Sequence, residues 1–220
     1  MKKKFILFLN GTYKKEDIEF YKELIGTKTS VAVDGGYEFF QQAKIKPDYI
    51  IGDMDSIDTM EDSIPDDIAV FEFPKDKDLT DGHAALDFCM KEDFSSIEVV
   101  MPNIGEPDHF IGNILLLFHK DVKKKIREKR SVMFICRDYE YRILDNSKLE
   151  ILDAAGDTFS ILPISKSIML FCEGTQYDVK NLKIDLGETR GLRNKIVANE
   201  MMLKISGEAI FIRKRNNLND

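Results

Sequence analysis

Short apolar runs alternate with amphipathic stretches over the first half of the chain. This alternation predicts strands over residues 4–9, 30–33, 48–51, 69–73 and 97–101, and helices over residues 16–25, 37–43, 80–92 and 110–120. Strands that alternate with helices form a mostly parallel sheet flanked by helices, and such sheets bind ligands at the carboxyl ends of their strands. We therefore expect an α/β N-terminal domain with its binding site at that edge.

A strongly basic segment, residues 121–130, follows these elements. No aromatic residue is interleaved with its lysines and arginines, so we interpret it as a solvated helix end and linker and not as a nucleic-acid patch. Beyond it, turn signals separate strands predicted over residues 132–136, 139–144, 158–162, 167–172, 182–186, 201–205 and 209–212. This rhythm is typical of an all-β sandwich. We expect an α/β domain at residues 1–138 and a β-sandwich domain at residues 139–220.

The composition is that of a soluble globular protein, with 43% hydrophobic and 32% charged residues. The net charge of -7 argues against nucleic acid as the main partner. No apolar run approaches the length that a membrane span needs, and the start of the chain does not resemble a signal peptide. The three cysteines lack the paired spacing of a metal or redox site, which indicates a reduced, cytoplasmic protein.

Two aspartates follow the strand predicted over residues 48–51. Asp53 and Asp55 come after Gly52 at a spacing of two, so in an extended chain their carboxylates can converge on one point beyond the strand. Mg²⁺ favours such oxygen ligands, together with water and phosphate. Taken alone, this stretch, which ends at Ser56, is more often a polar turn, because Asp and Ser are common turn residues.

Two glycines follow the strand predicted over residues 30–33. In Asp34-Gly35-Gly36 they permit a tight turn that exposes N–H groups at the start of a helix, where phosphate binds favourably. A plain strand-to-helix turn explains the same residues equally well. Asn10 stands at the corresponding place after the first strand.

Charged and polar residues crowd the start of the helix predicted over residues 80–92: Lys77, Asp78, Thr80 and Asp81. Asp78 or Thr80 could cap the helix, but capping does not require two acids and a lysine. With the two aspartates after the third strand, four carboxylates would surround one crevice, which is costly unless a metal and its phosphates neutralise them. This predicts a metal–phosphate site.

Polar residues also stand near the start of the last helix predicted in the α/β part. Asp108 could cap it, and Asn113 could face either the crevice or solvent. His109 could act as a general base, although a lone histidine at a helix start is more often structural.

Taken in order, these motifs resemble those of the thiamine pyrophosphokinase family. The most specific part of the resemblance is Gly52-Asp53-Met54-Asp55-Ser56 in combination with Lys77-Asp78-Leu79-Thr80-Asp81. The resemblance covers nearly the whole chain and includes Asn10-Gly11, Asp34-Gly35-Gly36, Asp108-His109 with Asn113, Gly174-Thr175-Gln176-Tyr177 and Gly191-Leu192-Arg193-Asn194.

The resemblance implies a transferase that moves the pyrophosphoryl group of ATP to the hydroxyl of thiamine, with Mg²⁺, to give thiamine diphosphate and AMP. It also implies a homodimer that binds thiamine between subunits and partly through the sandwich domain. It assigns metal and catalytic roles to Asp53, Asp55, Asp78 and Asp81, a catalytic role to Asp108, ATP or phosphate binding to Asn10, Asp34, Gly35, Gly36, Ser56, Lys77, Thr80 and Asn113, and thiamine binding to Gln176, Tyr177, Arg193 and Asn194.

Two positions depart from the family pattern. Glu106 stands where the family usually has an arginine before the last helix, which removes a phosphate-binding cation. Arg193 precedes Asn194 where a serine is common, and we expect it to supply the missing cation. Two alternatives stay open: transfer from Mg–ATP to a different alcohol, and a degenerate protein that binds thiamine or nucleotide without turnover.

Overall fold

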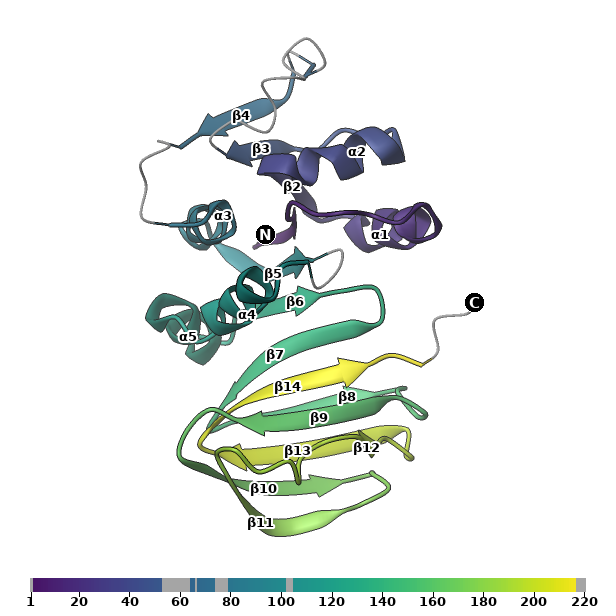
Figure 1. Cartoon of the computed structure of the whole chain (residues 1–220), viewed down its shortest axis with the longest axis vertical. Coiled ribbons are helices and arrows are strands. Elements are labelled where there is room, and N and C mark those ends of the chain that lie inside the picture. The colour runs from purple at the N-terminus through teal and green to yellow at the C-terminus, as the bar shows by residue number, and fades with distance from the viewer. Residues whose placement is uncertain (1, 53–63, 66, 74–78, 102–104, 217–220) are drawn as a thin grey trace. The chain divides into compact units, whose positions relative to one another are not determined.

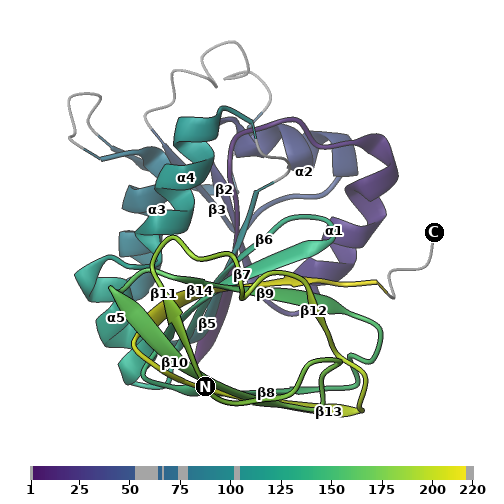
Figure 2. The same cartoon turned by 60° about the horizontal axis from the view of Figure 1, so that its bottom comes forward.

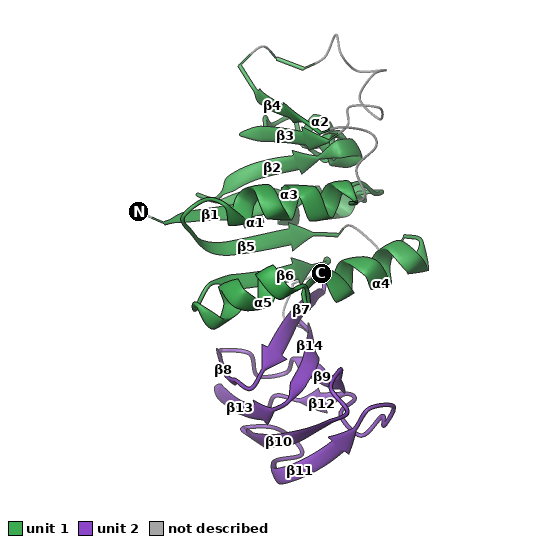
Figure 3. Cartoon of the chain, turned by 90° about the vertical axis from the view of Figure 1, so that its left-hand side faces the viewer, with its two compact units in different colours: residues 1–137 green, residues 138–220 purple. Residues whose placement is uncertain are grey.

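The computed structural model describes residues 2–52, 64–65, 67–73, 79–101 and 105–216 (Figure 1). The chain forms two compact units, residues 1–137 (unit 1) and 138–220 (unit 2), coloured separately in Figure 3. Among the helices of the described residues, none is long and apolar enough to cross a membrane.

Unit 1 contains a parallel sheet with the strand order β6-β5-β1-β2-β3-β4. Its strands are β1 Lys3–Phe8, β2 Thr29–Val33, β3 Tyr49–Gly52, β4 Ala69–Glu72, β5 Phe94–Val100 and β6 Ser131–Ile135. Its helices are α1 Ile18–Ile25, α2 Tyr37–Ala43, α3 Asp81–Met90, α4 Pro107–Leu116 and α5 Lys120–Arg127, and short 3₁₀ helices precede α1 and α2 at Lys15–Asp17 and Asp34–Gly36. Figures 1 and 2 show α1 and α2 on one face of this sheet and α3, α4 and α5 on the other. The predicted α/β organisation is confirmed.

The core beneath α1 and α2 is largely aromatic. Phe8 of β1 stacks on Phe39 of α2 with ring centroids 4.2 Å apart, and Phe40 and Tyr21 meet Phe8 edge-on. All four side chains are completely buried. Aromatic side chains bury more apolar surface than most others, so this cluster fixes the position of the β1 end that precedes Asn10.

One helix boundary differs from the sequence prediction. The helix expected over residues 110–120 is two helices, and residues 121–130, expected to be a helix end and linker, mostly belong to α5. The chain turns at Leu117, whose N–H bonds to Ile114 O, and at His119, whose N–H bonds to Leu116 O. Val122 is buried in α5, so the basic helix has an apolar anchor that its charge obscures in the sequence.

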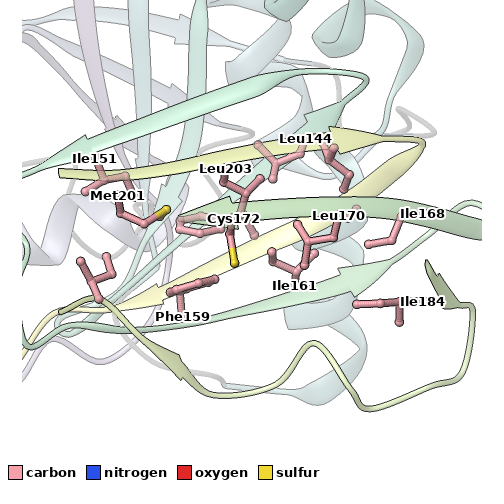
Figure 4. Packing of buried hydrophobic residues seen from close by; sticks show 14 of the residues in the cluster. Leu144, Ile151, Phe159, Ile161, Ile168, Leu170, Cys172, Ile184, Met201 and Leu203 are labelled. Carbon is pink, nitrogen blue, oxygen red and sulfur yellow. The ribbon is translucent and has the colours of Figure 1, made fainter. Parts of the chain in front are cut away.

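Unit 2 consists of antiparallel strands in the orders β12-β9-β14-β7 and β11-β10-β13-β8. The strands are β7 Tyr139–Asp145, β8 Lys148–Leu152, β9 Thr158–Pro163, β10 Ser167–Glu173, β11 Val179–Asp185, β12 Asn194–Lys195, β13 Glu200–Ser206 and β14 Glu208–Lys214. Side chains from both sets of strands, such as Phe159 and Ile161 of β9 and Leu170 and Cys172 of β10, share one buried cluster (Figure 4). The expected change to antiparallel β structure is confirmed, whereas β8 and β12 were not predicted.

Candidate active site

A cavity of about 360 Å³ lies in unit 1 beyond the carboxyl ends of β1, β2 and β5. This volume falls within the range of roughly 300–1,000 Å³ that is usual for small-molecule sites. Its wall combines apolar and polar side chains. The lining residues are Leu9, Asn10, Gly11, Val33, Asp34, Thr80, Asp81, Gly82, Met101, Gly105, Glu106, His109, Phe110 and Asn113.

The end of β1 supplies the first polar group of this cavity. Leu9 N donates to Val100 O of β5 at 3.1 Å, and the buried Tyr13 hydroxyl donates to Leu9 O at 2.7 Å. Burial raises the pKa of Tyr13 well above its ordinary value, so this hydroxyl stays protonated and keeps its role as donor. Both the N–H and the carbonyl of Leu9, the residue before Asn10, are therefore fixed by hydrogen bonds.

The end of β2 contributes Asp34 in a left-handed backbone conformation, with φ of 48°. Aspartate tolerates this conformation better than most residues, and strained backbone of this kind is concentrated at functional sites. A Cβ on Gly52 of β3 would lie 3.1 Å from Asp34 Cα, so the two strand ends approach closely.

Gly36 is required for steric reasons because it packs against backbone, whereas Gly35 packs against the end of a side chain. A Cβ on Gly35 would lie 2.5 Å from Asn10 Oδ1, and one on Gly36 would lie 1.9 Å from Phe8 O. Neither residue is among the cavity lining in the described part of the chain. Their predicted role in phosphate binding stays a prediction.

The N-terminus of α3 brings three further residues to the cavity. Thr80 caps the helix, because its Oγ1 accepts a hydrogen bond from His83 N at 3.3 Å. Asp81 stands in the first turn, where the helix dipole favours a carboxylate. A Cβ on Gly82 would approach Leu9 Cδ2 at 3.3 Å and Asn113 Oδ1 at 3.7 Å. The missing side chain of Gly82 thus leaves the Asn113 amide near the start of α3.

The N-terminus of α4 is acidic and exposed. Asp108 Oδ1 accepts from His109 N at 2.9 Å, and His109 Nε2 lies 3.9 Å from Glu106 Oε2. Asp108 stands beside the cavity in sequence, whereas Glu106 and His109 line it. Glu106 therefore places a carboxylate at the cavity instead of the cation that the family resemblance implies.

Oxygen atoms dominate the polar lining. Asp34 and Asp81 supply carboxylates, and Asn10 and Asn113 supply amide oxygens. The lining that the structure describes includes no lysine or arginine to neutralise these acids. Hard oxygen donors of this kind fit Mg²⁺.

Five predicted site residues lie outside the described residues: Asp53, Asp55, Ser56, Lys77 and Asp78. In the sequence, these five residues lie between Gly52, where β3 ends, and Asp81, where α3 begins. The structure therefore leaves their predicted roles as predictions.

The predicted thiamine ligands lie in unit 2. Tyr177 is 63% exposed, and Gln176 Nε2 donates to its hydroxyl at 3.2 Å. Arg193 is exposed and has a left-handed backbone, and its N–H donates to Ser160 Oγ at 3.1 Å. The Asn194 amide is part of a hydrogen-bond network within unit 2.

The apolar part of the cavity wall was not predicted. Leu9, Val33, Met101 and Phe110 line it beside the polar groups. All except Phe110 are buried ends of strands or directly follow them, and such residues are indistinguishable from core residues in a sequence. For Leu9, Val33 and Met101, the only available signal was their position as the last residue of a predicted strand.

An α/β unit with an oxygen-rich, acidic cavity at its strand ends has the arrangement of a phosphate-transferring enzyme. Residues 20–128 match the family described as "Thiamin pyrophosphokinase, catalytic domain". Over these residues the chain is similar to the thiamine pyrophosphokinase family.

Individual proteins of that name are similar to the chain. Thiamine pyrophosphokinase of Bacillus subtilis is 29% identical over 179 residues, which cover 76% of this chain and 78% of the relative. The crystal structure of the Bacillus subtilis protein aligns with a TM-score of 0.78 at 24% identity and covers 98% of this chain and 100% of that one. The thiamin pyrophosphokinase structure from Geobacillus thermodenitrificans has a TM-score of 0.79 at 24% identity and covers 97% and 99%. These structures share the fold of this chain.

Proposed function

We propose that this protein is a thiamine pyrophosphokinase that transfers the pyrophosphoryl group of ATP to the hydroxyl of thiamine, giving thiamine diphosphate and AMP. One observation supports this most directly. Asn10, Asp34, Thr80, Asp81 and Asn113 come from four segments of a chain that is similar to this family, and all line one cavity. Among the described members of the predicted ATP and metal site, only Gly35 and Gly36 do not line it.

The reaction forms a bond between the thiamine hydroxyl oxygen and the β-phosphorus of ATP, and AMP leaves as the bond from that phosphorus to the bridging oxygen breaks. Positioning and charge stabilisation account for most catalysis of this kind. The Thr80 hydroxyl donates to a phosphate oxygen while its lone pairs cap α3, and the first N–H groups of α3 face the same anion. Asp108, or Asp78 outside the described residues, accepts the thiamine proton.

Asp81, together with Asp53, Asp55 and Asp78, would hold Mg²⁺ in this proposal, and Asp34 would lie on the nucleotide side of the cavity. When bound, Mg²⁺ neutralises the phosphate oxygens and polarises the phosphorus. Without a cation, the acids of the cavity would repel the polyphosphate. The Asn10 and Asn113 amides then orient the nucleotide beside the apolar wall.

Unit 2 supplies the thiamine-binding part of the proposed enzyme through Gln176, Tyr177 and Arg193, with residues 139–220 as a β-sandwich domain that also forms a homodimer. All three cysteines are free thiols, which fits a reducing compartment such as the cytoplasm.

The proposal is tested by incubating the purified protein with Mg²⁺, ATP and thiamine and resolving the products. AMP and thiamine diphosphate in equal amounts are expected. ADP with thiamine monophosphate would instead indicate single phosphoryl transfer. Nucleotide turnover independent of thiamine would indicate another acceptor, and saturable thiamine binding without turnover would indicate a binding protein.

A matched pair of variants tests the site. Asp81→Asn is expected to lower turnover at least about 100-fold, because a carboxylate near the metal and phosphates contributes several kcal/mol. Asp121→Asn is the control, since Asp121 occupies the first turn of another helix, α5. Both variants should lose similar, small amounts of stability, about 0.3–1 kcal/mol, from the helix dipole. Asp53→Asn and Asp55→Asn should behave as Asp81→Asn does, and wild-type activity in all three would refute the metal site.

A further inference from the structure

The Asn194 amide has no hydrogen-bonding capacity left for a ligand. A primary amide offers two N–H donors and two acceptor lone pairs. Oδ1 accepts from Tyr177 N at 3.2 Å and from Lys195 N at 2.8 Å, while Nδ2 donates to Tyr177 O at 2.9 Å and to Thr175 Oγ1 at 3.2 Å. Each donor and each lone pair is therefore used within unit 2.

These contacts clamp the turn that follows β10, residues 174–178. The amide bonds to both the N–H and the carbonyl of Tyr177, as a neighbouring strand would. On the other side, Thr175 is only 6% exposed, and its N–H and hydroxyl donate to Asp178 Oδ1 at 2.9 and 3.0 Å. Gln176 N donates to Lys195 O at 2.8 Å.

The base of the turn is fixed as well. Gly174 has φ of 83°, and a Cβ there would lie 2.3 Å from Glu200 O, so no other residue fits without a shift. Val197 N donates to Gly174 O at 3.0 Å. The backbone of the turn is thus held from β12, from β13 and from within.

A largely exposed Tyr177 projects from this rigid turn beside Gln176. An aromatic side chain on an immobilised backbone binds with a low entropic cost, because little freedom remains to be lost. We propose that Asn194 is a positioning residue: it holds the Gln176–Tyr177 pair in the conformation that binds thiamine and does not itself contact thiamine. This inference rests on the proposed function, because thiamine is the ligand that it names.

The hydrogen bonds of the Asn194 side chain distinguish it from the other predicted thiamine ligands. To contact a ligand, the amide would have to release Tyr177 or Thr175, and Thr175 is buried. The buried Thr175 Oγ1 would then lose the hydrogen bond that it accepts from Asn194 Nδ2, and a buried polar atom that loses a partner is destabilising. The side chains of Gln176 and Tyr177 are exposed and need no such rearrangement.

Asn194→Asp is the principal variant. It preserves size and the oxygen that accepts from Tyr177 N, but it turns the second group from a donor into an acceptor facing Tyr177 O. Asn199→Asp is the matched control, since Asn199 is exposed on the same stretch between β12 and β13 and bonds to Asp153 through its backbone carbonyl.

Steady-state kinetics give the first readout. Asn194→Asp should raise KM for thiamine about tenfold, because two side chains that are no longer held in place must then be ordered on binding. The kcat and the KM for ATP should change less than about threefold, equivalent to under 1 kcal/mol. In the Tyr177→Ala background, Asn194→Asp should have little further effect on KM, because Asn194 acts through Tyr177. Full additivity of the two variants, or an unchanged KM in Asn194→Asp, would overturn the inference.

A second readout needs no thiamine. The chain contains no tryptophan, so Tyr177→Trp introduces a single fluorescent reporter at the turn. Its fluorescence anisotropy in the ligand-free protein should fall when Asn194→Asp is added and stay constant when Asn199→Asp is added. Constant anisotropy in both, with a raised KM, would show a direct ligand and refute positioning.

Different results would refute the proposed function and the positioning role of Asn194. A wild-type protein that neither binds nor turns over thiamine would refute the proposed function, and the anisotropy would still show whether Asn194 holds the turn. A wild-type protein that is active while Asn194→Asp has an unchanged KM would refute the positioning role alone. A large loss of thermal stability in Asn194→Asp, with KM for ATP raised equally, would show a general structural role and count against positioning.

Discussion

Two glycines of unit 1, Gly36 and Gly112, differ in the space that a side chain would find around them. Gly36 is buried at the start of α2, and a Cβ there would overlap the Phe8 carbonyl, with 1.9 Å to its oxygen and 2.8 Å to its carbon. Gly112 of α4 is the opposite case, since a Cβ there meets no atom within 4 Å. The same substitution should therefore have opposite effects at the two positions.

We predict that Gly36→Ala lowers the free energy of unfolding by about 1–3 kcal/mol, as overpacking against a fixed backbone does. Gly112→Ala should raise it by up to about 1 kcal/mol, because alanine is the better residue in a helix interior. Urea unfolding followed by circular dichroism measures both. Equal effects in the two variants would contradict the close packing of α2 against the end of β1.

At the residue scale, the sequence predicted the polar half of the cavity and missed the other half. Asn10 and Asp34 stand out as polar residues directly after predicted strands, and Asp81 stands out as one of two acids at the start of a predicted helix. Val33 and Met101 line the same cavity, yet an apolar residue at a strand end has an obvious place in the core. The hydrogen bonds of Asn194 reach back 17 and 19 residues, and no local pattern reveals them.

The hydroxyl of Thr80, the N-cap of α3, has both a structural role and a proposed functional role. Thr80 Oγ1 accepts from His83 N, and the same group is proposed to donate its proton to phosphate. Substitutions can separate the two, because a cap needs only an acceptor.

We predict that Thr80→Ala lowers both stability, by about 1 kcal/mol, and turnover. Thr80→Ser should preserve both. Thr80→Asp should keep the stability, since aspartate is a good cap, but it should lose turnover because it has no proton to donate and repels phosphate. Thermal unfolding and the product assay measure the two properties. Turnover retained in Thr80→Asp would exclude phosphate donation by Thr80.

The same helix carries a buried thiol. Burial, with a smaller contribution from the negative charge of Glu92, raises the pKa of Cys89 from 9.0 to about 12. Between these values the folded protein keeps a proton that the unfolded chain releases, so stability must fall as pH rises.

We predict that Cys89→Ala flattens the dependence of unfolding free energy on pH between about 9 and 12, by up to about 1.4 kcal/mol per pH unit. Below pH 8 the difference between variant and wild type should be constant, because both states then hold the proton. Urea unfolding across this pH range measures the slopes. Parallel curves for the two proteins would show that the thiol ionises equally in both states.

At the scale of elements, periodicity predicted most strands and helices and failed where contacts distant in sequence decide. β12 is only two residues, Asn194–Lys195, and exists through pairing with Phe159 and Thr158 of β9. β8 follows directly on the turn at Asn146 and Ser147, and it has one buried residue, Ile151, so its pattern is weak. Leu117 is completely buried at the break between α4 and α5, and the sequence alone does not specify this burial.

At the scale of the whole molecule, each unit has its own hydrophobic cluster. The cluster of unit 1 includes Phe8 and Phe39, and that of unit 2 includes Phe159 and Phe211. The proposed function divides the substrates between these units, with ATP bound by residues of unit 1 and thiamine by residues of unit 2. In the proposed homodimer, either subunit could complete a site.

Mixing two inactive variants decides how the subunits cooperate. Asp81→Asn impairs the proposed ATP site, and Tyr177→Ala impairs the proposed thiamine site. If each active site combines the ATP site of one subunit with the thiamine site of its partner, a dimer with one copy of each variant has one intact site. Random mixing makes about half of the dimers mixed, so we predict recovery of roughly a quarter of wild-type activity.

The experiment requires subunit exchange, achieved by co-expression with two different affinity tags and purification through both. The mass of the purified species should be twice the chain mass of 25.3 kDa, measured by light scattering. Doubly tagged dimers should then approach half of the wild-type activity per dimer, because each holds one intact and one doubly impaired site. Activity no higher than that of the single variants would place each thiamine with the ATP site of its own chain, and a monomeric mass would refute the dimer itself.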